Sequence, residues 1–377
     1  ITASLASMML AEQGARVIKV EPMAMGDPMR YIGSRKEDIS ALFANCNRGK
    51  ESLRIDLKSE LGIQVIKDMM PSVDIVIHNF RPGVMDRIGL GSEALRALNP
   101  KLIYAAISGF GTTGPMRDAP AYDPIIQAHA GIAATQGQGD QPAFMRTLLC
   151  DKITGYTACQ AVTSALFMRE RTGMGQHIDL SMIDSGLFFI FLDGFQNHTL
   201  LSDDHERAGM LIDILYDPWV CSDGGVVISA GSYEMQKRFL TSIDMPHLLD
   251  DPRFATFENQ MRHIQTLKAL VAERCRELSC DDMVARLRAV DVPCAKVMTR
   301  EEVLAQAQLE ANGCVDVYDH PIAGKSRRIL APPMFGGERL QPGTGAPGHG
   351  EHSQQVLESF GLSDTTIDEL KAKAVVT

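Results

Sequence analysis

The chain has 377 residues, enough for two or three domains around a substantial core. Its 47 acidic residues outnumber its 37 basic residues, and the net charge of −10 argues against a nucleic-acid-binding protein. No apolar run approaches the roughly 20 residues that cross a bilayer, no leader with a cleavage site opens the sequence, and the eight cysteines show no zinc-ligand spacing. We therefore expect a cytoplasmic protein with free thiols, no metal site and no membrane association.

Predicted helices and strands alternate through the first half of the chain. Because the sequence opens on a predicted helix that leads into a strand, we also expect a strand ahead of Ile1. Strands rich in Val and Ile that alternate with helices predict a parallel sheet covered on both faces. The elements expected are helices at residues 4–13, 59–70, 93–98, 153–171 and 184–200, and strands at 16–21, 73–79, 102–108 and 177–182.

A polar connector at residues 202–207 precedes a change in composition, after which a smaller α/β or α+β domain is expected. A Pro/Gly-rich tract at residues 331–352 then leads to a final pair of helices, and such tracts more often wrap a surface than form a core. In the smaller domain we expect strands at 225–231 and 292–297 and helices at 235–243, 264–277 and 280–289.

The sequence GFGTTG, from Gly109 to Gly114, follows a predicted strand and matches the dinucleotide-binding pattern GxGxxG. That pattern requires a helix to begin within it, but the next ten residues, PMRDAPAYDP, contain three prolines that oppose a helix. We therefore expect a flexible glycine loop at the end of a strand, and no nucleotide fingerprint.

Several cations follow predicted strands or lie in loops near them, and they could gather around a phosphate-bearing ligand despite the acidic total. The alternative is a solvated surface. The residues concerned are Arg30, Arg48, Lys50, Lys58, Arg81 and Arg87.

Asp151 stands near the start of the long apolar helix expected over residues 153–171. One interpretation is a helix N-cap. The other is a nucleophile, because a helix N-terminus stabilises an anionic carboxylate, which can attack an acyl group where other donors hold the oxyanion. Tyr122 and Asp123 would supply a hydroxyl and a second carboxylate, or serve as turn and cap residues. His129 is better explained by packing.

Eight segments, taken together and in order, resemble the class III CoA-transferase (CaiB/BaiF) family, which includes formyl-CoA and carnitine CoA-transferases and α-methylacyl-CoA racemases. The resemblance implies a Rossmann-like large domain, a smaller middle domain and an interlocked homodimer. It places the large domain over residues 1–205, the small domain over 216–312, and a linker with a return to the large domain over 313–377. The segments are LAEQGARVIKVEPMAMGDPMR, NRGKESLRIDLKSELG, VDIVIHNFRPGVMDRIGLG, LNPKLIYAAISGFGTTGP, AYDPIIQAHAGI, DKITGYTACQAVTSALFMRERTGMGQHIDLSMID, LLDDPRFAT and VPCAKVMTREEVLA.

The resemblance also implies the chemistry. Asp151 would attack an acyl-CoA thioester to give an aspartyl anhydride, then an aspartyl-CoA thioester, and a small carboxylic acid would accept the CoA. Coenzyme A is then a substrate, and no metal or redox cofactor is expected. Tyr122 and Asp123 match a pair beside the active site. Positions that contact CoA in the family are matched by Arg30, Ile55, Lys58, Asn79, Phe80 and Arg87.

Two departures from the family pattern bear on the activity. Racemases of the family carry a His-Asp pair where this chain has Tyr122-Asp123, so transfer is favoured over racemisation. The glycine-rich loop of formyl-CoA transferase has no counterpart at residues 230–235 (AGSYEM), which argues against formyl and oxalate substrates. Two alternatives remain open: an acyl-CoA isomerase (a racemase, or an enzyme that shifts CoA within one diacid) and a CoA-binding scaffold without activity.

Overall fold

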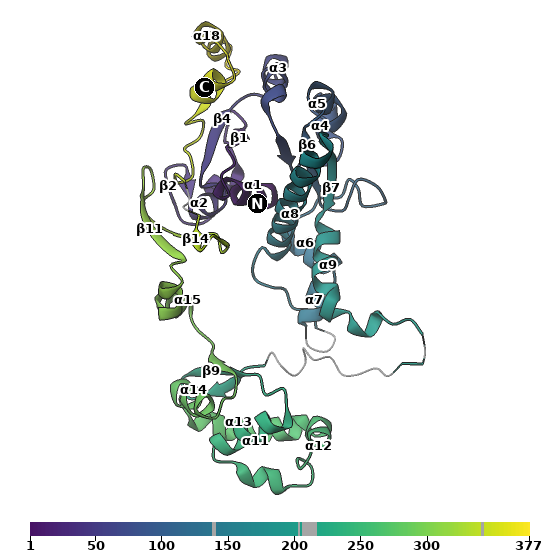
Figure 1. Ribbon diagram of the computed structural model, residues 1–377, viewed down its shortest axis with the longest axis vertical. Helices are drawn as coiled ribbons and strands as arrows, with labels where there is room; N and C mark the ends of the chain where they lie inside the picture. Colours follow the sequence, from purple (N-terminus) through teal and green to yellow (C-terminus); the bar gives the residue numbers. More distant parts are fainter. Residues whose placement is uncertain (138–140, 203, 206–216, 341–342) are drawn as a thin grey trace. The chain divides into compact units, whose positions relative to one another are not determined.

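The protein is described here from a computed structural model, which covers residues 1–137, 141–202, 204–205, 217–340 and 343–377 (Figure 1). The chain divides into a large unit, Ile1–Phe195 with Asn312–Thr377, and a small unit, Gln196–Ala311. The expected connector at 202–207 lies partly outside the described residues, and so does the expected start of the small domain at residue 216. Both ends of the chain therefore build the large unit.

The large unit contains a three-stranded parallel sheet with the order β5-β6-β7. Its strands are β5 (Ile75–His78), β6 (Ile103–Ser108) and β7 (His177–Ser181), as the Val/Ile-rich runs predict. The longer helices between and after them are α5 (Ser92–Leu98), α8 (Leu149–Thr172) and α9 (Met182–Gly194). The mixed α/β class with parallel sheets is thus confirmed.

A second, two-stranded parallel sheet pairs β1 (Val17–Glu21) with β4 (Lys50–Arg54), and α3 (Glu60–Met69) follows it. The strand β4 is absent from the sequence prediction, because its sequence KESLR has no apolar run. The C-terminal helices α17 (Ser353–Ser359) and α18 (Asp364–Ala372) supply apolar side chains to the core around β4 and α3. That core is assembled from residues 53–104 together with 356–376.

The first helix, α1 (Thr2–Glu12), packs against α8. Gly155 makes this close approach possible, since a β-carbon there would lie 3.1 Å from both the Thr2 carbonyl oxygen and Leu5 Cδ2. The apolar seam between α1, α8 and the sheet includes Ala6, Leu10, Ala105, Ala158 and Val162. The start of α1 is thereby fixed beside the start of α8.

The small unit has a three-stranded antiparallel sheet with the order β10-β9-β8, which makes it an α+β fold. Its strands are β8 (Trp219–Cys221), β9 (Gly224–Ile228) and β10 (Cys294–Lys296). The three predicted helices are present as α11 (Tyr233–Ser242), α13 (Ile264–Glu277) and α14 (Cys280–Ala289). The other helices among the described residues of this unit are η3 (Gln196–His198), η4 (Pro246–Asp250), α12 (Phe257–Arg262), α15 (Arg300–Ala305) and α16 (Ala307–Ala311).

The remaining elements of the large unit are short, apart from a hairpin of β11 (Val315–His320) and β12 (Gly324–Ile329) that the sequence does not predict. The segment GFGTTG is a loop, as expected, and the next helix begins only at Asp123. None of the described helices is both long enough and apolar enough to cross a membrane. The short elements are η1 (Pro28–Tyr31), β2 (Arg35–Lys36), β3 (Ile39–Ser40), α2 (Ala41–Asn47), η2 (Met70–Ser72), α4 (Val84–Arg87), α6 (Asp123–His129), α7 (Ile132–Gln136), β13 (Met334–Phe335) and β14 (Glu338–Arg339).

Candidate active site

Asp151 lies in the first turn of α8, whose N-cap residue is Leu148. The N-cap interpretation of Asp151 is therefore wrong. The helix α8 leads through a short turn into the start of β7, so its C-terminus lies at the amino end of the sheet and its N-terminus at the carboxyl end. Open α/β sheets bind their ligands at the carboxyl ends of the strands, so Asp151 occupies the end expected for a ligand site.

The Asp151 carboxylate accepts a hydrogen bond from the Thr2 hydroxyl at its oxygen Oδ1. Among the described residues, no hydrogen bond reaches the other oxygen, Oδ2. Thr2 is buried at the first position of α1, whereas the Asp151 side chain is only partly buried. Within the described part of the chain, one carboxylate oxygen is therefore held in place and the other has no hydrogen-bond donor.

Asp123 holds the backbone of Asp151. Its oxygen Oδ2 accepts the Asp151 N–H at 3.0 Å, which satisfies one of the amide groups that a first helical turn leaves unpaired. Its other oxygen accepts a hydrogen bond from Gln127 Nε2 at 2.6 Å. Asp123 is 2 % exposed, so this carboxylate fixes α6 to the start of α8 and is shielded from a ligand. The structure thus brings Asp123 and Asp151 together.

Two nearby residues, Tyr122 and His129, are not part of the hydrogen-bonded contact between Asp123 and Asp151 in the described structure. The Tyr122 ring is 75 % exposed, and within the described chain its hydroxyl donates no hydrogen bond to Asp123 or Asp151. His129 contacts Phe110 edge-on with ring centroids 5.3 Å apart but is otherwise exposed, so it is packed on one side only.

The thiol next to Asp151 is not a competing nucleophile. Burial, together with the charges of Asp123 and Asp151, raises the pKa of Cys150 to about 12. A thiol with such a pKa stays protonated near pH 7 and is a poor nucleophile. The carboxylate of Asp151 is therefore the group available for covalent chemistry at this position.

Four of the six residues matched to CoA contacts are exposed: Lys58, Asn79, Phe80 and Arg87. Asn79 and Phe80 directly follow β5, at the same end of the sheet as the start of α8. The Phe80 ring is half exposed and offers an aromatic face, while Lys58 and Arg87 offer positive charge. This combination suits a ligand that carries both a ring and phosphate groups.

Arg30 and Ile55 differ from these four residues, because their side chains are buried. The structure corrects the expectation that these two side chains contact CoA directly. The Arg30 guanidinium is fully buried, with hydrogen bonds to Glu21 at 2.6 and 2.9 Å, to Asp38 at 3.0 Å and to the Pro347 carbonyl at 3.0 Å. Ile55 is fully buried in the core of the large unit. Both side chains are therefore part of the interior of the large unit and stabilise its fold.

Two further members of the expected cationic cluster are also internal. Arg48 is paired with Glu12 and donates to the Ile329 carbonyl at 3.0 Å. Burial, with the neighbouring Lys19 ammonium, lowers the pKa of Lys50 well below its usual value. The exposed cations of the cluster are therefore Lys58, Arg81 and Arg87.

The structure adds Arg117, which sequence reasoning missed. A β-carbon on Gly83 would lie 3.4 Å from Arg87 Nη1 and 3.8 Å from Arg117 Nη2, so both guanidinium groups lie beside the turn that follows β5. Arg117 is exposed and belongs to the loop that follows GFGTTG. The only signal in the sequence was that this loop follows a parallel strand, whose carboxyl end is where ligands bind.

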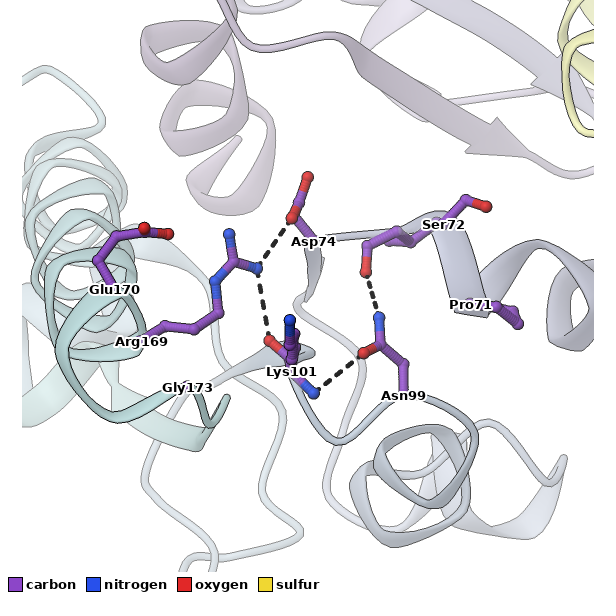
Figure 2. Close-up of a pocket in the computed structure, with 9 residues that line it drawn as sticks. Pro71, Ser72, Asp74, Asn99, Lys101, Arg169, Glu170 and Gly173 are labelled. Atoms are coloured by element: carbon purple, nitrogen blue, oxygen red, sulfur yellow. Dashed lines mark hydrogen bonds and ion pairs between the residues drawn. The ribbon is translucent and has the colours of Figure 1, made fainter.

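A cavity of about 420 Å³ lies at the opposite, amino end of the sheet. Two of its polar side chains are bonded to their surroundings. Arg169 pairs with Asp74 at 2.9 Å and donates to the Lys101 carbonyl at 3.4 Å (Figure 2), and Asn99 donates to the Val73 carbonyl at 2.8 Å. These groups serve to connect α8 to the loops before β5 and β6. The cavity therefore contains none of the residues expected at the active site.

Within the described ranges, no three His, Cys, Asp or Glu side chains form a group that could hold a metal ion. Within the described residues, seven cysteines form no disulfide: Cys46, Cys150, Cys159, Cys221, Cys275, Cys280 and Cys294.

Comparison with known proteins agrees with these observations. The sequence model of "CoA-transferase family III" matches residues 1–353. The chain is 39% identical to an acetyl-CoA:oxalate CoA-transferase of Acetobacter aceti over 269 residues, 69% of this chain and 68% of the relative. It is 31% identical to a succinyl-CoA--D-citramalate CoA-transferase of Chloroflexus aurantiacus over 375 residues, 98% of this chain and 93% of the relative.

A crystal structure of a CaiB/BaiF family protein from Brucella suis has the same fold, with a TM-score of 0.84 and 31% identity over 96% of both chains. Since the family model spans residues 1–353, the Chloroflexus aurantiacus relative matches 98% of this chain and the Brucella suis structure has the same fold, the chain belongs to CoA-transferase family III.

Proposed function

We propose that the protein transfers CoA from an acyl-CoA thioester to a small carboxylic acid through covalent intermediates on Asp151. The observation that carries this proposal is the state of the Asp151 carboxylate at the ligand end of the sheet. Thr2 holds Oδ1, Asp123 holds the backbone N–H, and no other described residue donates a hydrogen bond to Oδ2. A positioned carboxylate with one free oxygen is suited to nucleophilic attack.

The reaction is a series of acyl transfers, and no step requires the protein to supply or remove a proton or an electron. Asp151 Oδ2 attacks the thioester carbon of the donor, the C–S bond breaks, and CoA leaves as a thiolate. The thiolate attacks Cγ of Asp151, the donor acid leaves, and an aspartyl-CoA thioester remains. The acceptor carboxylate attacks Cγ and expels the thiolate, which then attacks the acceptor acyl carbon and restores the free carboxylate. Each intermediate is an activated acyl group.

Because every step is an acyl transfer, the reaction requires no metal or redox cofactor, and coenzyme A takes part as a substrate. Asp123, buried and bonded to the Asp151 backbone, positions the nucleophile. Lys58, Asn79, Phe80 and Arg87 would bind the CoA, joined by Arg117 beside Arg87. The guanidinium groups would pair with phosphates and the Phe80 ring would contact the adenine.

A homodimer is part of this proposal. The helix α9 has a row of exposed apolar side chains, with Phe188 and Leu192 each 77 % exposed. Phe189 and Leu187 extend this surface, which is larger than the scattered apolar exposure of a typical monomer. A second copy of the chain would bury the exposed face of α9.

The decisive experiment traps the covalent intermediate. The protein is incubated with acetyl-CoA or succinyl-CoA and hydroxylamine, and the modified peptide is mapped by mass spectrometry. We expect a hydroxamate on Asp151, its loss together with all transfer in Asp151→Ala, and no change in Glu170→Gln, which removes an exposed carboxylate from the far end of the same helix. Transfer that survives in Asp151→Ala would refute the proposal.

A screen of these donors against oxalate, glutarate and citramalate, with unfolding curves for each variant, would identify the acceptor. Exchange of deuterium into the α-carbon of a 2-methylacyl-CoA without an acceptor, and without an adduct on Asp151, would indicate an isomerase instead.

A further inference from the structure

The Thr2 hydroxyl is the side-chain group that contacts the proposed nucleophile directly. Thr2 is 1 % exposed, and its one hydroxyl hydrogen points to Oδ1 of Asp151. This donor lies 149 residues from its acceptor in the sequence. The contact therefore depends entirely on how α1 and α8 are held together.

The first turn of α1 is anchored on two sides. The buried Lys50 ammonium donates to the Ser4 carbonyl at 2.7 Å and to Asn47 Oδ1 at 2.9 Å. On the other side, α1 lies so close to α8 that a β-carbon on Gly155 would be 3.1 Å from the Thr2 carbonyl oxygen. A donor fixed in this way needs no rearrangement before it can act, which is the property that makes oxyanion-hole donors effective.

Oδ1 has a particular role in the proposed route. After Oδ2 has bonded to the donor acyl group, Oδ1 is the carbonyl oxygen of the aspartyl anhydride. Both later additions at Cγ, by the CoA thiolate and by the acceptor carboxylate, place the negative charge of the tetrahedral intermediate on Oδ1. The Thr2 hydroxyl already points at that atom.

We infer that Thr2 is the oxyanion donor for the steps that occur at the carbonyl carbon of Asp151. This inference rests on the proposed function. In each addition the nucleophile bonds to Cγ, the C=O electron pair moves to Oδ1, and the hydroxyl of Thr2 strengthens its hydrogen bond without giving up its proton. The leaving group, first the donor carboxylate and later the CoA thiolate, departs as the carbonyl reforms.

If Thr2 is this oxyanion donor, loss of its hydroxyl should slow the steps at Cγ of Asp151 more than the first attack on the donor. The first attack occurs at the acyl carbon of the donor, whose oxyanion is a different atom. Without the Thr2 hydroxyl, Asp123 still holds the Asp151 backbone N–H at 3.0 Å and so keeps the nucleophile in place, which leaves this step largely intact. Loss of a single oxyanion donor slows the step it serves by roughly 100- to 1,000-fold. Thr2→Val, which keeps the shape of the side chain, should therefore slow formation of the aspartyl-CoA adduct by about that factor.

The test is rapid-quench mass spectrometry with succinyl-CoA, or with acetyl-CoA if the wild type reacts faster with it. Two quantities are followed: release of the CoA thiol, which reports the first step, and the mass of the aspartyl-CoA adduct, which reports the second. We expect Thr2→Val to release CoA at close to the wild-type rate and to form the adduct slowly. Thr2→Ser should restore both rates. Ser7→Ala, which removes a hydroxyl bonded only to the backbone of α1, should behave as wild type.

The outcomes separate the inference from the function on which it rests. Adduct formation at the wild-type rate in Thr2→Val, while Asp151→Ala forms none, would overturn the inference and leave the function standing. Equal slowing of both steps, or slow adduct formation in Thr2→Ser as well, would show that Thr2 acts only through the packing of α1. An adduct that still forms in Asp151→Ala would overturn both. Thermal unfolding of each variant identifies loss of the fold, and Thr2→Ala provides a second hydroxyl-free variant.

Discussion

Replacement of Arg30 by methionine separates a structural arginine from one that binds a ligand. Arg30 and Arg87 both match CoA-contacting positions, but only Arg87 is exposed. In Arg30→Met, Glu21 would stay buried with only the Ser52 hydroxyl at 2.7 Å and the Asp27 N–H at 2.9 Å as donors. Removal of one partner from a buried ion pair costs about 3–5 kcal/mol. Since typical proteins unfold with about 5–15 kcal/mol, this is a large share of the total.

The loss should depend on pH. Burial raises the pKa of Glu21, but the hydrogen bonds and charge of Arg30, with the Ser52 and Asp27 donors, outweigh it and hold that pKa below its ordinary 4.5. A lowered pKa contributes stability that is present above pH 4.5 and is lost as the pH falls through the folded-state value. Without Arg30, burial dominates and the pKa of Glu21 rises, so acid unfolding should begin at a higher pH.

The assay must report on the large unit. The single tryptophan, Trp219, lies in the small unit, so its fluorescence is the wrong probe. Peptide-resolved hydrogen exchange over β1 and β4, with urea titrations followed by circular dichroism, measures the relevant stability. Arg87→Met is the matched control: we expect its stability to change by less than about 0.5 kcal/mol and its KM for acyl-CoA to rise. If Arg30→Met kept its stability and raised KM instead, the structural assignment of Arg30 would be refuted.

Two further predictions concern the packing of α1 and the surface of α9. Gly155→Ala places a β-carbon 3.1 Å from the Thr2 carbonyl oxygen, so α1 must shift by a few tenths of an ångström. We expect kcat to fall about tenfold, with little change in melting temperature. An unchanged kcat would contradict the dependence of catalysis on the position of α1. In analytical ultracentrifugation, we expect the wild type to be a dimer. The variant in which Phe188 and Leu192 are both replaced by glutamate should be a monomer. A wild-type monomer at micromolar concentration would rule out the proposed interface.

The sequence predicts well those elements whose apolar pattern is repeated over many residues. The helices α13 and α14 and the strands β5, β6 and β7 appear close to their expected bounds, because periodicity reports directly on which side is buried. The helix α8 is present but begins at Leu149, four residues before its expected start, so Asp151 lies inside it. The strand β4, with the sequence KESLR, has no such signal. It is held in the sheet by pairing with β1, from Val17↔Lys50 to Glu21↔Arg54, which is a tertiary effect.

The site was predictable in part. Asp151 and Asp123 stand at recognisable positions, and the structure joins them through one hydrogen bond of 3.0 Å. Thr2 was not predictable, because a hydroxyl at the start of a helix is an ordinary residue until the fold brings a carboxylate to it. Likewise, nothing in the order of charges along the chain shows that Arg30 is buried, since one of its acceptors, the Pro347 carbonyl, lies 317 residues away.

The way the end of the chain returns to β4 has a consequence for biosynthesis. The Asp56 N–H bonds to the Val375 carbonyl at 2.8 Å, the His352 N–H to the Ser52 carbonyl at 3.1 Å, and Ile55 forms a bridge with Val376. The core of the large unit is thus complete only after residues 352–376 have been synthesised, while the small unit, a continuous stretch of sequence, is translated in full before them. During that interval the nascent amino-terminal half has an unfinished core, and this is the stage at which chaperones would protect it from aggregation.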